Sequence, residues 1–410
     1  MNAKLFNASL LIACVLLARP IQASTSGYNV IVPATGGSVN AEIRAINDAG
    51  QLAGQTYFSG KATNAALWSS GGSPVLDLGT VSGASFSTAY SINDFGQTAG
   101  TSGFLTGGIA SSWVATRWSV DLSNNVTVNN LGKLSDDSDS FAHGINNAGL
   151  VVGESGSDSS RIFQAILWDS SGGMHILDSW GGDNSSAKGI NNFNQVVGAS
   201  KDTLGLYHAT QWNWNGSVAT ITDLGTPVGW VQSGAFAIND NAHVAGIVGD
   251  DSSEFPGAMF HATLWDGSGA HDLGALGQLS FANGINSSDQ VVGWTDAAGD
   301  GNYHATLWDH GITIDLNSLL SSQIPTNWVL TEATGINDSG WITVIARNPA
   351  EGLLVNTITG LPMLDEFGNQ RYVQHAFLLA PVPEPETYAM FMAGLGLMGF
   401  IARRRKNSQV

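Results

Sequence analysis

Cysteine is almost absent from this chain, and basic residues are scarce. The single cysteine, Cys14, lies in an expected leader, so a mature protein would contain no disulfide and must be stabilised by packing. The 410 residues include 15 Lys and Arg against 33 Asp and Glu, a formal charge of −18. Because a nucleic-acid surface needs clustered cations, nucleic acid is excluded as a partner. With 51 glycines and 43% apolar residues, the chain is expected to fold and to be rich in turns.

The first 23 residues follow the pattern of a secretory signal helix. Lys4 precedes an apolar run from Leu10 to Ala18, Pro20 ends it, and a small-residue exit predicts cleavage after Ala23. Lipoprotein processing at Cys14 is the alternative, but the apolar run continues beyond the cysteine, which is the wrong order for that processing. We therefore expect a secreted protein whose first partner is signal peptidase.

The other end combines three features in order. Pro383-Glu384-Pro385 is followed by an apolar stretch at 388–402 and by a basic cluster. The stretch is shorter than a comfortable membrane helix, while the cations would hold their end on the cytoplasmic side. A simple tail anchor is one interpretation. The expected processing and sorting residues are Ala23, Pro383, Glu384, Pro385, Arg403, Arg404 and Arg405.

This tail resembles the PEP-CTERM sorting signal of Gram-negative bacteria. The resemblance implies cleavage by an exosortase-type protease after transient membrane insertion through a short C-terminal transmembrane helix. It also implies a location at the cell surface or in the extracellular matrix of an organism that makes exopolysaccharide. The expected organisation is a signal peptide at 1–23, a repeat domain at 24–381 and a sorting segment at 382–410. Without the two end segments, nine basic and 31 acidic residues remain, a charge of about −22.

The body contains a repeat with three elements. An Ile-Asn pair recurs at spacings of 45 to 53 residues, starting at Ile46, Ile92, Ile145, Ile190, Ile238, Ile285 and Ile336. A strand-like segment follows each pair and ends in Trp in six units, as in Gln164-Ala165-Ile166-Leu167-Trp168, and in Leu379 in the seventh. Asp-Leu-Gly or a relative then precedes the next pair. Before the first pair its place is taken by 28–32, so the count closes at seven units.

Each unit reads as four short antiparallel strands: the run into Asp-Leu-Gly, the run into Ile-Asn, the run after the turn, and the strand that ends in Trp. Four strands per unit predict an all-β protein, a seven-bladed β-propeller. The residues after Ile-Asn suit a four-residue turn ending in a left-handed residue: Gly four times, then Asn194, Asp289 and, less suitably, Ala242. The repeated Asn is interpreted as a turn residue and the repeated Trp as core rather than a sugar platform. An open β-solenoid is the alternative fold.

The repeat is similar to the bacterial extracellular HAF-repeat family. His375-Ala376-Phe377 matches its signature, which is relaxed to His-Ala-Thr at 208, 261 and 304. The resemblance covers about residues 28–380 and implies a secreted, propeller-like protein without an established catalytic activity. The seventh unit departs from the pattern in a long stretch from Arg347 to Gln370 before its last strand.

Candidate ligand sites are few. His208, His261, His304 and His375 occupy equivalent positions, but a ring would hold them apart, whereas zinc needs its ligands about 2 Å from one centre. The segment with Asp296 and Asp300 partly resembles a calcium-binding loop but lacks its full set of ligands. Calcium is therefore a weak expectation, and no other cofactor is expected.

The sequence therefore favours a non-catalytic surface or matrix protein that binds a glycan, a surface protein or the polymer layer of a biofilm. A polysaccharide-active enzyme, with Asp365 and Glu366 in its long loop, is the second hypothesis. An envelope structural protein that presents an acidic coat is the third.

Overall fold

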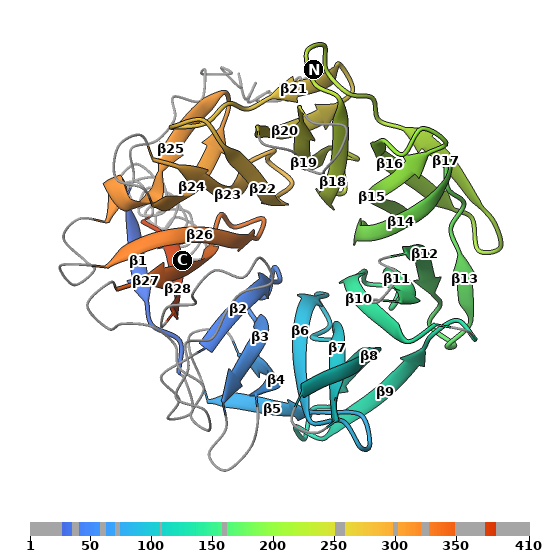
Figure 1. The fold of residues 1–410 in the computed structure, drawn as a ribbon. Helices are drawn as coiled ribbons and strands as arrows, with labels where there is room; N and C mark the ends of the chain where they lie inside the picture. Colours follow the sequence, from blue (N-terminus) through green and yellow to red (C-terminus); the bar gives the residue numbers. More distant parts are fainter. Residues whose placement is uncertain are drawn as a thin grey trace, which may run out of the picture.

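The protein is a ring of seven sheets in a computed structural model (Figure 1). The structure describes residues 27–34, 41–57, 63–69, 74–106, 109–135, 137–157, 162–250, 259–297, 302–320, 328–348 and 374–382. The predicted signal helix and the predicted C-terminal transmembrane helix lie outside these residues. Within them, no helix is long and apolar enough to cross a membrane. The prediction of a seven-bladed propeller is confirmed.

Each blade has four antiparallel strands, and in six blades these follow one another along the chain from the axis outwards (Figure 1). Blade 1 is β2 (Ala41–Ile46), β3 (Leu52–Tyr57), β4 (Thr63–Trp68) and β5 (Val75–Gly79); blade 2 is β6 (Phe86–Ile92), β7 (Thr98–Thr106), β8 (Ile109–Val120) and β9 (Val126–Gly132). Blade 3 is β10 (Asp139–Ile145), β11 (Val151–Ser157), β12 (Ile162–Trp168) and β13 (Met174–Ile176); blade 4 is β14 (Gly181–Ile190), β15 (Gln195–Asp202), β16 (Tyr207–Trp214) and β17 (Ala219–Asp223).

The remaining blades repeat this order. Blade 5 is β18 (Gln232–Ile238), β19 (Val244–Gly249), β20 (Phe260–Asp266) and β21 (Gly269–Asp272); blade 6 is β22 (Ser280–Ile285), β23 (Val291–Asp296), β24 (Tyr303–Asp309) and β25 (Ile312–Asp315). Blade 7 is β26 (Val329–Ile336), β27 (Ile342–Arg347), β28 (Gln374–Pro381) and β1 (Tyr28–Ile31), and a short 3₁₀ helix, η1 (Leu316–Leu319), precedes it.

The boundary of a blade differs from the boundary of the sequence unit. The sequence unit groups the Asp-Leu-Gly strand with the Ile-Asn strand that follows it, whereas in the structure it pairs with the Trp strand before it. In blade 1, Val75 of β5 lies opposite Trp68 of β4. A cyclic repeat can be divided at any strand, and hairpin pairing of consecutive strands places the division between Asp-Leu-Gly and Ile-Asn.

The Ile-Asn turns form as predicted. The fourth turn residue is left-handed in all seven blades, with φ between 61° and 75°, and includes Ala242 at φ 64°. In every turn the Asn side-chain oxygen accepts the backbone N–H four residues later. This explains why Asn recurs at that position.

The repeated Trp is core, as predicted. Trp68, Trp118, Trp168 and Trp212 have no exposed surface, and Trp265 and Trp308 are 3% exposed. Four indoles also clamp adjacent blades, because each donates to a carbonyl of the preceding outer region: Trp68 to Ala34, Trp118 to Gly79, Trp212 to Asp178 and Trp265 to Gly225. Each of these four blades is thereby fixed to the one before it.

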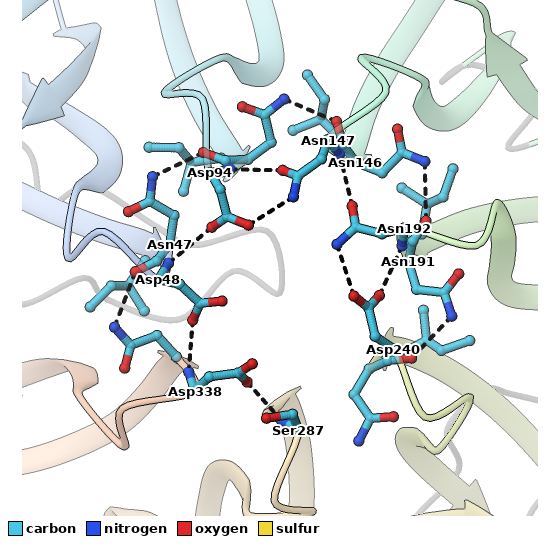
Figure 2. A pocket seen from close by; sticks show the side chains of 18 of the residues that line it. Asn47, Asp48, Asp94, Asn146, Asn147, Asn191, Asn192, Asp240, Ser287 and Asp338 are labelled. Carbon is cyan, nitrogen blue, oxygen red and sulfur yellow. Dashed lines mark hydrogen bonds between the residues drawn. The ribbon is translucent and has the colours of Figure 1, made fainter.

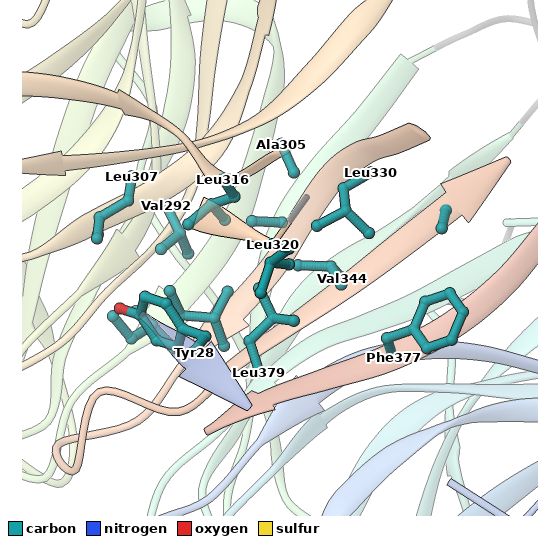
Figure 3. Packing of buried hydrophobic residues seen from close by; sticks show 14 residues of the cluster. Tyr28, Val292, Ala305, Leu307, Leu316, Leu320, Leu330, Val344, Phe377 and Leu379 are labelled. Carbon is teal, nitrogen blue, oxygen red and sulfur yellow. The ribbon is translucent and has the colours of Figure 1, made fainter. Parts of the chain in front are cut away.

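The N-terminal strand closes the ring. β1 pairs along the outer edge of β28, with Tyr28 opposite Pro381 and Ile31 opposite Leu378. Figure 3 shows Tyr28 beside Leu379 in the largest apolar cluster, which also takes in Leu316 and Leu320 around η1. Residues 28–32 therefore do occupy the place of the missing Asp-Leu-Gly element.

Candidate functional site

The seven Ile-Asn turns converge on the axis and form two concentric rings of polar groups (Figure 2). We call the first the asparagine ring: Asn47, Asn93, Asn146, Asn191, Asn239, Asn286 and Asn337. Each Asn is 2–6% exposed, and its side-chain N–H donates to the backbone carbonyl of the Asn in the next blade at 2.9–3.2 Å. The last bond, from Asn337 to Asn47, closes the circle.

The next residue of each turn forms the second ring: Asp48, Asp94, Asn147, Asn192, Asp240, Ser287 and Asp338. Six backbone N–H groups of this ring donate to the side-chain oxygen of the next member at 2.8–3.1 Å. Asn147 and Asn192 also donate to the neighbouring carboxylates of Asp94 and Asp240. The two rings and the Ile side chains surround a pocket of about 180 Å³.

The electrostatics of this mouth are acidic. Burial raises the pKa of Asp48, and the charges of Asp338, Asp94 and Asp240 raise it further against a hydrogen bond from the Asp338 backbone. Phe95 and Phe193, in the third position of two turns, are 72% and 68% exposed. The amides and carboxylates of the two polar rings bond to one another. Most polar groups of this mouth therefore stabilise the rings themselves.

A second axial layer lies further along the innermost strands. Each of these strands contains a β-bulge at one equivalent position, which re-aims a side chain. We call these residues the bulge layer: Arg44, Tyr90, His143, Lys188, Phe236, Asn283 and Thr334. All seven are partly exposed, and no two are alike. They meet across blades; for example, Thr334 donates to the Ile43 carbonyl at 2.8 Å.

Charged groups gather in one part of this layer. His143 Nε2 lies 3.1 Å from Glu154 Oε1 and 3.1 Å from Lys188 Nζ, and Lys188 lies 3.4 Å from Glu154. Burial and the Lys188 charge lower the pKa of His143. Burial opposes ionisation of Glu154, but the Lys188 charge and the His143 hydrogen bond outweigh it and hold the pKa of Glu154 below its usual range. This trio can hold a proton or bind a hydroxyl group.

A second charged group lies in blade 1. Arg44 bonds to Glu42 at 2.8 Å, Gln55 donates to the same carboxylate at 2.9 Å, and the guanidinium lies 5.4 Å from the Tyr90 ring centroid. Neither charged group is predicted from the sequence, because the repeat analysis rests on residues that recur and these residues do not. The signal was present: the residue two before Ile-Asn varies in every unit, while its neighbours change little.

The predicted histidine positions are structural pairs in separate blades. His208, His261 and His304 contact the Asp of the adjacent outer strand through Nδ1, at 2.8–2.9 Å from Asp223, Asp272 and Asp315. His375 packs against the Trp328 ring. In the described part of the chain, no group of three or more His, Cys, Asp or Glu could hold a metal ion.

Of the two carboxylates in the predicted calcium loop, Asp296 lies in the described part of the chain. Its side-chain oxygen accepts the backbone N–H groups of Gln278 and Leu279, both at 2.6 Å, so it holds a connection between strands. Asp300, Asp365 and Glu366 lie outside the described residues, as do Ala23, Pro383, Glu384, Pro385, Arg403, Arg404 and Arg405.

The chain continues from the closing strand directly into the predicted sorting segment, since β28 ends at Pro381. Residues 381–406 match the family model of the PEP-CTERM protein-sorting motif. This motif implies an extracellular or cell-envelope protein processed by exosortase. The match covers the tail alone, and the HAF-repeat resemblance of the body stays a prediction. A comparison with curated protein sequences finds no match.

Solved structures similar to this chain are distant propellers. The β-propeller domain of the Trilobed protease from Pyrococcus furiosus is 8% identical over 63% of this chain and 79% of that one, with a TM-score of 0.41. A puromycin-hydrolyzing peptidase from Mycobacterium tuberculosis is 11% identical over 78% of this chain, which spans 52% of that one, with a TM-score of 0.43. A gluconolactonase from Xanthomonas campestris is 14% identical over 58% and 83%, with a TM-score of 0.29. These likenesses carry no argument about activity.

Proposed function

We propose that this chain is a non-catalytic propeller of the Gram-negative cell surface, sorted by exosortase, that binds an extracellular polysaccharide of its own matrix. The observation that carries the proposal is the PEP-CTERM motif at 381–406, which begins where the closing strand β28 ends. The tail thus follows a complete ring, and its removal would leave all seven blades intact. Signal peptidase and an exosortase-type protease are the partners in processing, with transient insertion of the tail in the inner membrane.

Processing is tested by the intact mass of the protein recovered from the cell surface and medium of the producing bacterium. We expect a chain from Ser24 to near Val382, with or without an added glycan or lipid. In cells that lack the exosortase, the chain should keep its tail to Val410 and fractionate with the inner membrane. A variant ending at Val382 is the matched control and should reach the medium in both strains. A surface protein of wild-type cells that still carries Val410 would contradict the proposal.

Binding is tested separately with the processed ring. The protein from Ser24 to Val382 should sediment with the extracellular polysaccharide of the producing culture. It should leave the chain length of the polysaccharide unchanged. The ring after thermal unfolding is the control for trapping.

One observation favours a second candidate, a polysaccharide-active enzyme. His143, Glu154 and Lys188 form a compact, partly exposed cluster of the kind that can transfer protons. Release of reducing ends from the polysaccharide, abolished by Glu154→Gln and by His143→Gln, would establish that candidate in place of the first.

A further inference from the structure

The two ends of the propeller axis carry different kinds of side chain. The turn end carries the polar rings, whereas the start of the innermost strand in blade 6 carries aromatic residues. Along β22 the chain runs from Phe281 near the strand start to Ile285 next to the asparagine ring. In the sheet, Phe281 is opposite Trp294, and Tyr303 is opposite Asp296 at the far end of β23. The aromatic residues therefore lie towards the end of the ring that faces away from the Ile-Asn turns.

These side chains form one continuous set, which we call the aromatic band: Phe236, Phe260, Phe281, Trp294 and Tyr303. Phe236 of the bulge layer contacts Phe281 with centroids 4.7 Å apart, and Phe281 stacks parallel to Trp294 at 5.8 Å. Trp294 contacts Tyr303 at 4.3 Å and Phe260 edge-on at 5.7 Å. The band therefore runs from the axis across the boundary of blades 5 and 6 to the outside.

The band is open to solvent where a ligand could reach it. Tyr303 is 51% exposed, and the other four rings are partly exposed, unlike the repeated Trp residues of the core. The fold does not require an indole at the position of Trp294, because blade 3 has Glu154 there. Aromatic rings with a few polar groups are the usual lining of a small-molecule site, and an indole face offers a broad apolar surface.

The polar neighbours of the band indicate the charge of its ligand. Asn283 donates to Glu332 at 2.9 Å and to the Ala333 carbonyl at 3.0 Å beside Phe281. The innermost strands carry only two Lys or Arg residues, and each is paired: Arg44 with Glu42 and Lys188 with Glu154. The body also has a charge of about −22, which repels anions. An anionic polymer would therefore be repelled by the acidic body, and on the innermost strands it would meet cations that are already paired with carboxylates.

We propose that the aromatic band is a binding site for a neutral glycan, whose apolar sugar faces stack on Trp294 and Tyr303 and whose hydroxyl groups bond to the polar residues beside them. This inference rests on the proposed function and deepens it, since it selects neutral sugars over polyuronates and places them at the end of the ring opposite the Ile-Asn turns.

The test uses the processed ring and the extracellular polysaccharide of the producing culture, separated into neutral and acidic fractions by anion exchange. Binding is measured by calorimetry for the unaltered ring, for Trp294→Ala and Tyr303→Ala, and for Phe193→Ala as the matched control at the opposite end. We expect the neutral fraction to bind, both band variants to bind at least tenfold more weakly, and Phe193→Ala to bind normally. Because Tyr303 is half exposed, its truncation leaves folding intact even if Trp294→Ala does not fold.

Any of four results would overturn the inference. Binding of the acidic fraction alone would contradict the inference that the ligand is neutral. Normal binding by Tyr303→Ala, or loss confined to Phe193→Ala, would move the site away from the band while the proposed polysaccharide binding stands. Failure of both fractions to bind the unaltered ring would remove the polysaccharide-binding function together with this site.

Discussion

The bulge layer lies within the seven innermost strands and the asparagine ring lies in the turns that directly follow them, yet the two differ in composition and in burial. The ring has one residue type at seven positions, buried and bonded into a closed circle. The bulge layer has seven different residues at seven equivalent positions, all partly exposed. Positions that the fold needs are repeated, and positions that the fold leaves open are varied. Function is therefore to be sought where the repeat fails.

The largest expected effect breaks the ring itself. Asn239→Ala removes side-chain bonds to the Asn286 carbonyl and Asp289 and leaves the N–H groups of Asn241 and His243 without their acceptor. Loss of buried hydrogen bonds of this kind should lower the free energy of unfolding by about 3 kcal/mol. Phe236→Leu, in the bulge of the same strand, should cost about 1 kcal/mol. Urea unfolding of both variants checks the difference, and equal losses would contradict it.

A smaller effect is expected from the charged trio of the bulge layer. Glu154→Gln leaves Lys188 without its carboxylate and should cost about 2 kcal/mol at neutral pH. Because the folded pKa of Glu154 is depressed, its contribution is present above the unfolded pKa and is lost as the pH falls through the folded value. The stability difference between the two proteins should thus shrink below about pH 4.5, as measured by denaturant unfolding across pH. A constant difference would contradict the depressed pKa.

His143, a base in the same trio, should also make the stability of the protein depend on pH. Its folded pKa is lowered, so the unfolded state binds its proton more readily and stability falls as the pH drops below the unfolded value of about 6.5. His143→Gln should flatten that fall between neutral and mildly acidic pH. Thermal unfolding of both proteins over this range checks it, and parallel pH profiles would show that His143 is not responsible.

One position in the turns should gain stability on substitution. Ala242 has φ 64°, where six other blades place Gly, Asn or Asp. Ala242→Gly should stabilise the protein by about 1 kcal/mol, because the strain of a left-handed alanine is removed. Gly340→Ala, the reverse change in blade 7, should destabilise it. The melting temperatures of the two variants test this prediction. A lower melting temperature for Ala242→Gly would contradict the proposed strain at Ala242.

The smallest expected effect concerns the acidic mouth. Asp48→Asn keeps an oxygen for the Asp338 N–H and removes a carboxylate whose pKa is raised by burial and by the charges of Asp338, Asp94 and Asp240. The pattern of Asn147, which donates to Asp94, shows that an amide fits there. A gain of about 0.5 kcal/mol at neutral pH is expected, in keeping with an exposed contact. The gain should vanish at a pH where the carboxyl is protonated, as followed by denaturant unfolding.

The sequence was sufficient for the blade count, the turn conformation and the role of Trp, because each rests on local chemistry repeated seven times. Ala242 was correctly placed in a left-handed turn although alanine disfavours it. The division between blades was not readable, since Asp77-Leu78-Gly79 lies between two candidate partners and only strand pairing decides. His261 and Asp272 form a pair through adjacent strands, and His143, Glu154 and Lys188 meet through three strands of two blades. Such contacts depend on register and on bulges that no single segment encodes.

The closing strand has a mechanical consequence. Because β1 covers the outer edge of β28, the strand that leads into the tail is interior to its sheet, with β27 on its other side. The Val382 N–H also donates to the Gly27 carbonyl at 3.0 Å. Any pull on the chain beyond residue 381 is therefore shared by two ladders of hydrogen bonds and cannot peel an edge strand. The tail is thus attached to an interior strand, at the point where a tethered protein would bear load.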